Sequence, residues 1–440
     1  MDNTEFAYRR QVLMEQMGQN SIAIIPTAPE RLRNRDVDYP YRPDSDFYYL
    51  TGFAEPESLA VLIPNRPQGQ YLLFCRERDL EKETWHGRRA GLEGACERYG
   101  ADDAFPITDI DDIVPGLMEN KHRLYYTMGY YPEFDHKILD WTNQLREKER
   151  MGVSTPKETV ALDHILHPMR LRKREAEITA LRQAIAVTVQ AHQRAMQVCR
   201  AGMYEYQLEA ELIHEFMRQG CRSPAYPSIV GSGENTCILH YIDNNMQLKD
   251  GDLVLIDAGA EFDCYAADIT RTFPVNSHFS ETQRAIYELV LRAQQAIIAV
   301  IRPGTFWNQL QEIAVNVLTE GLVELGLLQG KIDTLIEEET YKRFYMHRSG
   351  HWLGMDVHDV GGYKIDEEWR VLESGMVLTV EPGLYIPAGM QDVPKQWWNI
   401  GVRIEDDVLV TEQGHEVLTE ALPKTVAEIE ALMAQSTHTC

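Results

Sequence analysis

Short apolar runs and longer polar segments alternate along the first third of the chain. The apolar runs have the length and composition of strands, and the polar segments between them have a helical composition. The predicted strands are Ser21 to Ile25, Leu59 to Ile63, Tyr71 to Cys75 and Leu124 to Thr127. This alternation predicts an N-terminal α/β domain that ends near residue 170.

A helical pattern begins after residue 170. Between Lys173 and Arg200, apolar residues recur every three to four positions, which predicts one long amphipathic helix with a polar face. Ser280 to Gln283 form a capping box before a second long helix, Arg284 to Ile301, which is expected to end at Arg302-Pro303-Gly304. We therefore predict two domains, residues 1–170 and residues 171–440, as the chain length also favours.

The second domain contains an internal repeat. Residues 199–208 match residues 301–310 at Arg, Gly, Gln and Leu, where in each case one long helix ends and another begins. Residues 251–259 parallel residues 375–383, each with a turn, a strand, a carboxylate and a glycine in the same order. Chance similarity between short strands is the alternative, but a repeat at this scale predicts two related halves.

Each half carries two carboxylates beside predicted strands. Asp257 and Glu381 end the first strand of their half, and Asp268 and Glu405 adjoin a second strand. A turn expected at residues 261–263 would let two antiparallel strands direct Asp257 and Asp268 to the same side. Carboxylates at the ends of buried strands are costly unless they are paired or bind metal, so a metal pair is predicted where the halves meet.

Three histidines share one segment whose glycines disfavour a helix. His347, His351 and His358 are the histidines, and residues 350 and 354 are the glycines. The segment has no His-Glu-x-x-His pattern, which disfavours a single-zinc protease. One imidazole as a metal ligand, with the others near the substrate, fits the number of donors.

Four carboxylates and one imidazole suit manganese, magnesium or cobalt better than a structural zinc ion. Two ions held roughly 3.5 to 4 Å apart can bridge a water and lower its pKa from about 15.7 toward 7, which predicts amide hydrolysis by a bridging hydroxide. The chain has neither a Gly-x-Ser-x-Gly motif nor a recognisable catalytic cysteine, so a Ser or Cys nucleophile is unsupported.

Composition excludes several other classes. The formal charge of −25 argues against a nucleic-acid-binding surface. The first residues lack the apolar core of a secretory signal, and no window approaches 18 uninterrupted apolar residues, so we expect no membrane association. The seven cysteines are widely spaced, with no Cys-x-x-Cys pair, which predicts reduced thiols and a cytoplasmic protein.

These motifs, in this order, resemble the aminopeptidase P family, whose members remove an N-terminal residue when the next residue is proline. The resemblance spans nearly the whole chain and includes Tyr39 to Phe53 and Ile229 to Tyr241. It implies a pita-bread fold for the second domain, in agreement with the repeat. The expected fold is therefore an α/β domain followed by an α+β pita-bread domain with an internal pseudo-twofold duplication.

The resemblance also implies roles for individual residues. It implies two manganese(II) ions per subunit, replaceable by cobalt or another divalent metal, on Asp257, Asp268, His351, Glu381 and Glu405, with Asp268 and Glu405 bridging. The implied catalytic residues are His240, His347, His358, Glu381 and Arg403, and Tyr385 is the implied substrate-binding residue. The implied partners are peptides that begin with X-Pro, and the implied assembly is a homodimer or homotetramer.

The segment departs from many relatives at Arg348 and Ser349, where the family often has His-Gly-x-x-His. A glycine would suit a backbone conformation that arginine adopts reluctantly, so the position of His347 stays open. An arginine beside the pocket is also expected to alter substrate preference.

An X-Pro bond lacks the N–H that general peptidases bind, so a dedicated pocket is needed. Candidates for its rim are Trp85, His86, Arg88 and Arg89, or else Trp397 and Trp398. A prolidase that cleaves X-Pro dipeptides would use the same metal ligands. A metal-free pita-bread binding module is the alternative from another class, and it is disfavoured because all five ligand positions hold donor residues.

Overall fold

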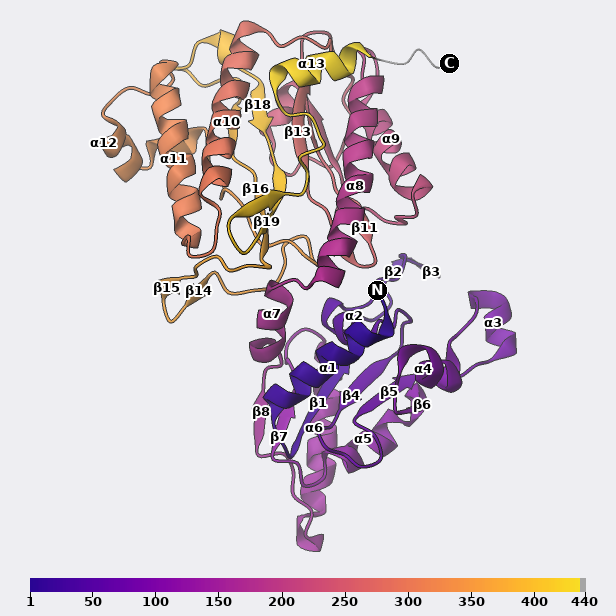
Figure 1. Cartoon of the computed structure of the whole chain (residues 1–440). Coiled ribbons are helices and arrows are strands. Elements are labelled where there is room, and N and C mark those ends of the chain that lie inside the picture. Colours follow the sequence, from indigo (N-terminus) through magenta and orange to yellow (C-terminus); the bar gives the residue numbers. More distant parts are fainter. Residues whose placement is uncertain (436–440) are drawn as a thin grey trace. The chain divides into compact units, whose positions relative to one another are not determined.

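The computed structural model describes residues 1–435, which form two compact units. The first unit is Met1–Met169, and the second begins at Arg170. Figure 1 shows that the first unit is built around a sheet with helices packed on it, and that long helices flank the strands of the second.

The first unit has a mixed six-stranded sheet in the order β6-β5-β4-β1-β7-β8. Strand β1 pairs antiparallel with β4 and parallel with β7. The elements up to the boundary are α1 (Asn3–Met17), β1 (Ser21–Pro26), β2 (Leu32–Asn34), β3 (Val37–Asp38), α2 (Ser45–Thr51), β4 (Leu59–Leu62), β5 (Tyr71–Cys75), α3 (Leu80–His86), α4 (Gly91–Tyr99), β6 (Asp103–Pro106), α5 (Ile110–Met118), β7 (Arg123–Tyr125), α6 (Pro132–Glu147), β8 (Glu158–Val160) and α7 (Asp163–Leu171). All four predicted strands form, with ends shifted by at most two residues.

Apolar strand residues and helices α5 and α6 make the core of this unit. Ile24, Val61 and Phe74 lie on the sheet, and Val114 and Trp141 come from the two helices. Each of these side chains is at most 1% exposed. The alternation of apolar strands with polar helical segments therefore arises because helices cover the sheet.

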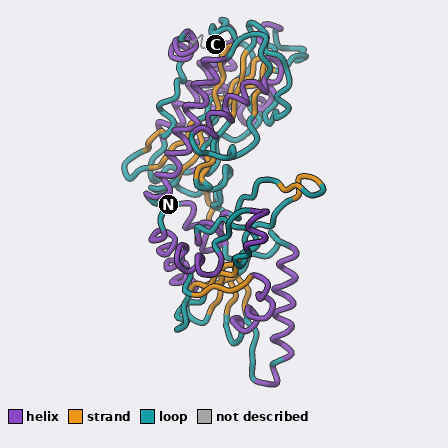
Figure 2. Tube along the Cα trace, turned by 90° about the vertical axis from the view of Figure 1, so that its right-hand side faces the viewer, coloured by secondary structure: helices purple, strands orange, loops and turns teal. Residues whose placement is uncertain are grey.

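The second unit combines two helix pairs with short antiparallel sheets. Contacts within the unit join α8 to α9 and α10 to α11. Figure 2 colours the helices and strands of both units. Its elements are α8 (Glu175–Val198), α9 (Glu205–Arg218), β9 (Ile229–Ser232), β10 (Leu253–Asp257), β11 (Glu261–Phe262), β12 (Tyr265–Ala266), β13 (Thr270–Pro274), α10 (Glu281–Val300), α11 (Trp307–Glu324), α12 (Ile332–Glu337), β14 (Lys364–Ile365), β15 (Glu368–Trp369), β16 (Val377–Val380), β17 (Gly383–Ile386), β18 (Ile400–Arg403), β19 (Asp406–Val410), β20 (His415–Val417) and α13 (Val426–Ala434). The predicted capping box forms at the start of α10, where Ser280 Oγ accepts from Gln283 N.

The two halves of the second unit follow the same plan. Helix pair α8–α9 precedes β10, which pairs antiparallel with β13, and helix pair α10–α11 precedes β16, which pairs antiparallel with β19. The turn between β10 and β13 is formed by the left-handed residues Asp263 and Cys264, so it shares only Asp263 with the predicted turn, whose first two residues form β11 instead. A left-handed pair suits a tight hairpin, which the apolar pattern alone did not locate.

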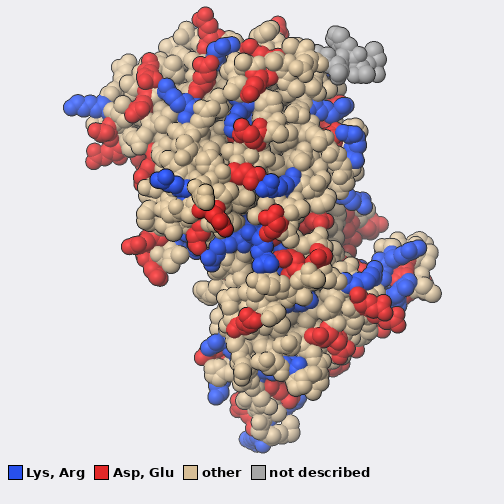
Figure 3. All heavy atoms as spheres, in the orientation of Figure 1, with Lys and Arg blue, Asp and Glu red and all other residues tan. Residues whose placement is uncertain are grey.

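Acidic and basic side chains are intermixed on the face shown in Figure 3, within the overall charge of −25. Six cysteines lie among the described residues and none of them forms a disulfide. Cys440, also predicted to be a reduced thiol, lies outside the described residues. Among residues 1–435, no helix has both the length and the apolar character needed to cross a membrane.

Candidate metal centre and substrate cavity

A cavity of about 1090 Å³ lies within the second unit. Nine of the residues singled out from the sequence line it, namely His240, Asp257, Asp268, His347, His351, His358, Glu381, Arg403 and Glu405. Tyr385 is fully buried next to them, where its hydroxyl contacts His347 and Arg403. The structure therefore brings together the residues that the sequence analysis grouped.

Strand ends deliver the four carboxylates. In the first half, β10 ends at Asp257, and Asp268 lies two residues before β13. In the second half, Glu381 directly follows β16 and Glu405 directly precedes β19. Because each strand pair is antiparallel, the end of one strand lies beside the start of the other, and both acids of a half meet there.

Three of the five candidate ligands come especially close. Donor atoms of Asp268, His351 and Glu405 all lie within 4.8 Å of one another. His351 Nε2 is 3.3 Å from Asp268 Oδ2 and 3.6 Å from Glu381 Oε1. Its other ring nitrogen, Nδ1, lies 3.0 Å from the carbonyl oxygen of Trp352. A hydrogen bond donated there leaves Nε2 free as a ligand atom, as is usual for metal-binding histidines.

Backbone contacts hold His351 against strand β16. His351 N donates to Thr379 Oγ1 at 3.0 Å, and Thr379 N donates to His351 O at 2.9 Å. A Cβ atom on Gly350 would lie only 2.0 Å from the carbonyl oxygen of Thr379. Glycine at position 350 therefore lets this segment approach β16 closely enough to place the imidazole.

Burial and mutual repulsion disfavour the charged forms of these carboxylates. Burial, together with the neighbouring acids, raises the pKa of Asp268, raises that of Glu381 to about 7 and raises that of Glu405 well above its ordinary value. Burial alone would lower the pKa of His351, but Asp268 and Glu381 raise it to about 9. Like charges that are buried together suit bound divalent cations, so the donor set fits a metal centre.

Tyr226 is part of this centre although the sequence analysis missed it. Its hydroxyl lies 2.6 Å from Asp257 Oδ1 and 2.5 Å from Asp268 Oδ1. Burial and then the neighbouring carboxylates raise the pKa of Tyr226 well above its ordinary value, which keeps the hydroxyl protonated. No motif surrounds Tyr226 in the chain, so only the fold reveals its position between the two acids.

Arg403 connects the candidate metal ligands of the two halves through hydrogen bonds. Its Nη2 donates to Asp257 Oδ2 at 2.6 Å, its Nη1 donates to Tyr385 OH at 3.0 Å, and its Nε donates to Thr270 Oγ1 at 3.1 Å. Thr270 Oγ1 in turn donates to Glu405 Oε2 at 2.6 Å. One guanidinium thus links acids from both halves of the unit.

The three remaining histidines differ in whether their ring nitrogens are hydrogen-bonded to the protein. His347 Nδ1 lies 2.7 Å from the carbonyl oxygen of Arg348 and Nε2 lies 2.8 Å from Tyr385 OH, so both ring nitrogens are engaged. Burial, and then the charge of Arg403, lowers the pKa of His347 to about 4, so its ring is neutral at neutral pH. Within residues 1–435, His240 and His358 make no side-chain hydrogen bond to protein groups, which leaves them available to a substrate.

The backbone at Arg348 does not need glycine. The backbone of Arg348 does not have a positive φ, so any L-amino acid can adopt its conformation. The close approach occurs two residues later, at Gly350. The expected reluctance of arginine at this position was therefore wrong, and His347 reaches Tyr385.

Aromatic residues that the sequence analysis did not single out form part of the cavity wall. These are Trp307, Tyr363 and Trp369. Trp397 packs in the core instead, and Trp398 Nε1 donates to Val393 O, so neither lines the cavity. Trp85 lies in α3 of the first unit and is 80% exposed there.

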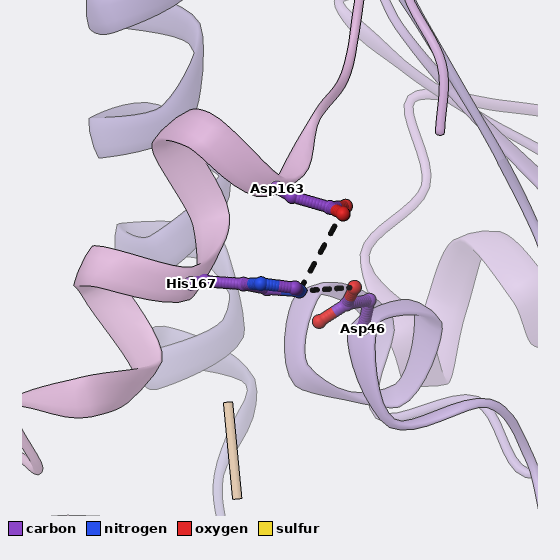
Figure 4. A group of neighbouring side chains, drawn as sticks. All are labelled: Asp46, Asp163 and His167. Atoms are coloured by element: carbon purple, nitrogen blue, oxygen red, sulfur yellow. Dashed lines mark ion pairs between the residues drawn. The ribbon is translucent and has the colours of Figure 1, made fainter. Parts of the chain in front are cut away.

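The first unit holds a separate group of two carboxylates and one imidazole. His167 Nε2 lies 3.5 Å from Asp46 Oδ2 and 3.8 Å from Asp163 Oδ1 (Figure 4). Asp163 also accepts a hydrogen bond from the hydroxyl of Thr127. Because Asp46 belongs to α2 while Asp163 and His167 belong to α7, the group joins these two helices.

The fold and the cavity are those of a metal-dependent hydrolase. Residues 179–412 match the family described as metallopeptidase family M24, and residues 6–125 match the aminopeptidase P N-terminal domain. The chain therefore belongs to the aminopeptidase P proteins of metallopeptidase family M24. This confirms the predicted fold of an α/β domain followed by a pita-bread domain, and it confirms the predicted enzyme class.

Similar proteins cover the whole chain. An Xaa-Pro aminopeptidase from Escherichia coli is 48% identical over 98% of this chain and 97% of the relative. The solved structure of an aminopeptidase from Pseudomonas aeruginosa is 60% identical, covers 99% of both chains and superposes with a TM-score of 0.98. A zinc-substituted Escherichia coli aminopeptidase P in complex with product is 46% identical, covers 100% of both chains and has a TM-score of 0.97.

Proposed function

We propose that this protein is a metal-dependent Xaa-Pro aminopeptidase, which releases the N-terminal residue from peptides with proline in the second position. The observation that carries the proposal is the meeting of four carboxylates and one imidazole in a single cavity. Relatives with this activity in their names align over nearly the full length of the chain, which supports the same reaction here.

We assign the metal to Asp257, Asp268, His351, Glu381 and Glu405. The proposed occupants are two manganese(II) ions per chain, because oxygen ligands predominate and such ligands suit manganese. When bound, such ions polarise a carbonyl group and generate a nucleophile from water at neutral pH. Tyr226 and Arg403 would orient Asp257 and Asp268 toward the ions, because they hold the oxygen atoms of these acids at hydrogen-bond distance.

The histidines divide into two roles. His347, Tyr385 and Arg403 form a hydrogen-bonded chain that ends on Asp257, so we assign them to shaping the proline side of the cavity. Among residues 1–435, the imidazoles of His240 and His358 make no hydrogen bond to protein groups, so we assign them to donate hydrogen bonds to the oxygen that gains charge during attack. Glu381 is assigned to carry a proton to the proline nitrogen, which has none of its own and must gain one when the bond breaks.

The assembly and the location are also proposals. We propose a cytoplasmic homodimer or homotetramer, in which the domain of residues 1–170 restricts access to the cavity or forms the interface. Leu80 and Trp85 of α3 are 77% and 80% exposed, and large apolar residues on the surface favour a protein contact. Light scattering on the purified protein would measure the assembly directly.

Substrate cleavage tests the proposed function. The purified protein, supplied with manganese, would be given Ala-Pro-Ala, Ala-Ala-Ala and the dipeptide Ala-Pro. We expect alanine to be released from Ala-Pro-Ala, with little release from Ala-Ala-Ala. Cleavage of Ala-Pro alone would identify a prolidase, and failure to cleave any of the three would favour a binding module.

A further inference from the structure

Arg348 offers an unused cation on the cavity wall. The residue lines the cavity and its side chain is exposed. Within the described residues, its guanidinium makes no hydrogen bond or ion pair, and only its carbonyl oxygen is engaged, by His347 Nδ1 at 2.7 Å. A guanidinium presents several N–H donors in one plane, in a geometry that matches a carboxylate.

The backbone that carries Arg348 is fixed on both sides. His347 is held by Tyr385 OH at 2.8 Å. Ser349 N donates to Gln311 Oε1 at 2.7 Å, and Ser349 O accepts from Glu381 N at 2.9 Å. The Cα atom of Arg348 is therefore positioned relative to Glu381, and only the side chain must order when it binds a partner. This limits the entropic cost of binding.

The other cationic side chains of the cavity already have partners. Arg403 is 3% exposed and is engaged by Asp257 and Tyr385. Lys364 lies 3.7 Å from Glu367 and 5.0 Å above the ring of Trp369. Among the described arginines and lysines that line the cavity, Arg348 is thus the one with no side-chain partner.

Charge indicates which part of a peptide Arg348 meets. The N-terminal residue of the substrate carries an ammonium group, which a guanidinium repels. The part beyond proline ends in a carboxylate or carries acidic side chains. The cavity, at about 1090 Å³, exceeds the roughly 300 to 1,000 Å³ typical of small-molecule sites, which leaves room for residues after proline.

We propose that Arg348 binds a carboxylate on the residue that follows proline, so that the protein selects peptides with an acidic group at that position. The proposal rests on the proposed Xaa-Pro aminopeptidase activity. Two sources supply this chemistry, the C-terminal carboxylate of a tripeptide and the side chain of an acidic residue in a longer peptide. Arg348 is a specificity residue in this account and takes no part in bond cleavage.

Two matched peptide pairs test the proposal. Ala-Pro-Ala with a free C-terminus is compared with its amide, and Ala-Pro-Glu-amide is compared with Ala-Pro-Gln-amide. We expect the wild type to prefer the carboxylate member of at least one pair by about 10-fold in kcat/KM, mainly through KM, as for one charge-assisted contact at a partly exposed site. Arg348→Met should abolish the preference. Arg343→Met is the matched control and should keep it, because Arg343 pairs with Asp392 at 2.7 Å and does not line the cavity.

The outcomes separate the inference from the proposed function. A preference confined to the first pair identifies the C-terminal carboxylate, and one confined to the second identifies an acidic side chain. No preference in the wild type, or one that persists in Arg348→Met, overturns the inference while cleavage itself upholds the aminopeptidase. If no peptide is cleaved, calorimetry still decides, with Pro-Ala compared with Pro-Ala-amide and Pro-Glu-amide compared with Pro-Gln-amide. Tighter binding of the carboxylate member of either pair, if it needs Arg348, upholds the carboxylate site alone, and equal binding within both pairs overturns it.

Discussion

The buried carboxylate of Glu205 is expected to hold the segment that carries His240. Glu205 begins α9 and is completely buried. Its Oε1 accepts from Ser232 N at 2.6 Å, from Ser232 Oγ at 2.8 Å and from Asn235 Nδ2 at 3.1 Å. Its Oε2 accepts from Tyr241 OH at 2.8 Å and from Met246 N at 2.9 Å. These donors bracket His240, so Glu205→Gln should loosen that segment.

The size of the stability loss in Glu205→Gln follows from which hydrogen bonds of the carboxylate a glutamine side chain can still make. The glutamine oxygen can accept the hydrogen bonds from Ser232 and Asn235, and the glutamine amide can donate to Tyr241 OH. Met246 N–H then loses its acceptor and faces another donor. A buried N–H without an acceptor costs roughly 1 to 3 kcal/mol, and the remaining bonds lose their charge assistance. Removing a buried charge offsets part of this loss. We expect the free energy of unfolding to fall by about 2 to 4 kcal/mol, which lowers Tm by roughly 3 to 7 °C for a unit of this size.

The assay pairs urea unfolding with peptide cleavage. Glu209→Gln is the control, since Glu209 lies one turn further along α9, is half-buried and accepts from Asn244 Nδ2 at 2.9 Å. We expect that variant to lose less than about 1 kcal/mol. In Glu205→Gln, kcat/KM should also fall by about 10-fold while metal content stays unchanged. If Glu205→Gln loses no more stability than Glu209→Gln, the carboxylate does not organise the segment and the reasoning is wrong.

Three further predictions concern charge, close packing and the guanidinium link. Asp359 lies 2.8 Å from Lys173 Nζ and 2.6 Å from Arg170 Nη2, and although burial opposes them, these cations lower the pKa of Asp359. The ionised carboxylate therefore stabilises the fold above about pH 3.8, and this stabilisation is lost as the pH falls through the lower folded-state pKa. Asp359→Asn should lower the free energy of unfolding by about 3 to 5 kcal/mol at pH 7. Urea unfolding at several pH values should show that the difference in stability between wild type and variant shrinks in acid. Gly350→Ala places a Cβ atom against Thr379 O, so metal affinity measured by competition with a chelator should fall by about 10- to 100-fold, and unchanged affinity would refute the role of this close approach. Arg403→Lys cannot keep its contacts to Asp257, Tyr385 and Thr270 together, so kcat/KM should fall by about 10- to 100-fold, whereas a fall below 2-fold would contradict the assigned role.

Many strands and helices of this fold could be predicted because the sequence patterns that specify them are local. The apolar runs from Ser21 and from Tyr71 became strands β1 and β5, and the capping box at Ser280 became the start of α10. The repeat also had a local signature, since a strand followed by an acid occurs in each half at Asp257 and Glu381. Local backbone preference and strand alternation fix such features before any tertiary contact forms.

The site residues that could not be predicted are placed by contacts between segments far apart in the sequence. Tyr226 reaches Asp257 and Asp268, which lie 31 and 42 residues further along the chain, and nothing beside Tyr226 signals this. Trp307 in α11 and Trp369 in β15 line the cavity, whereas Trp397, from the same half of the unit, is a core residue. Long-range packing decides whether a tryptophan faces a cavity or the core, and single-sequence patterns do not record it.

Metal titration of the stripped protein tests whether cleavage depends on ions bound by the five donor residues. Protein freed of metal by a chelator would be titrated with manganese while the release of alanine from Ala-Pro-Ala is recorded and bound metal is counted by mass spectrometry. We expect no cleavage without metal and full activity at two manganese ions per chain, with Glu405→Gln binding fewer ions and remaining inactive. Full cleavage by the stripped protein, or an activity that manganese does not change, would contradict this expectation.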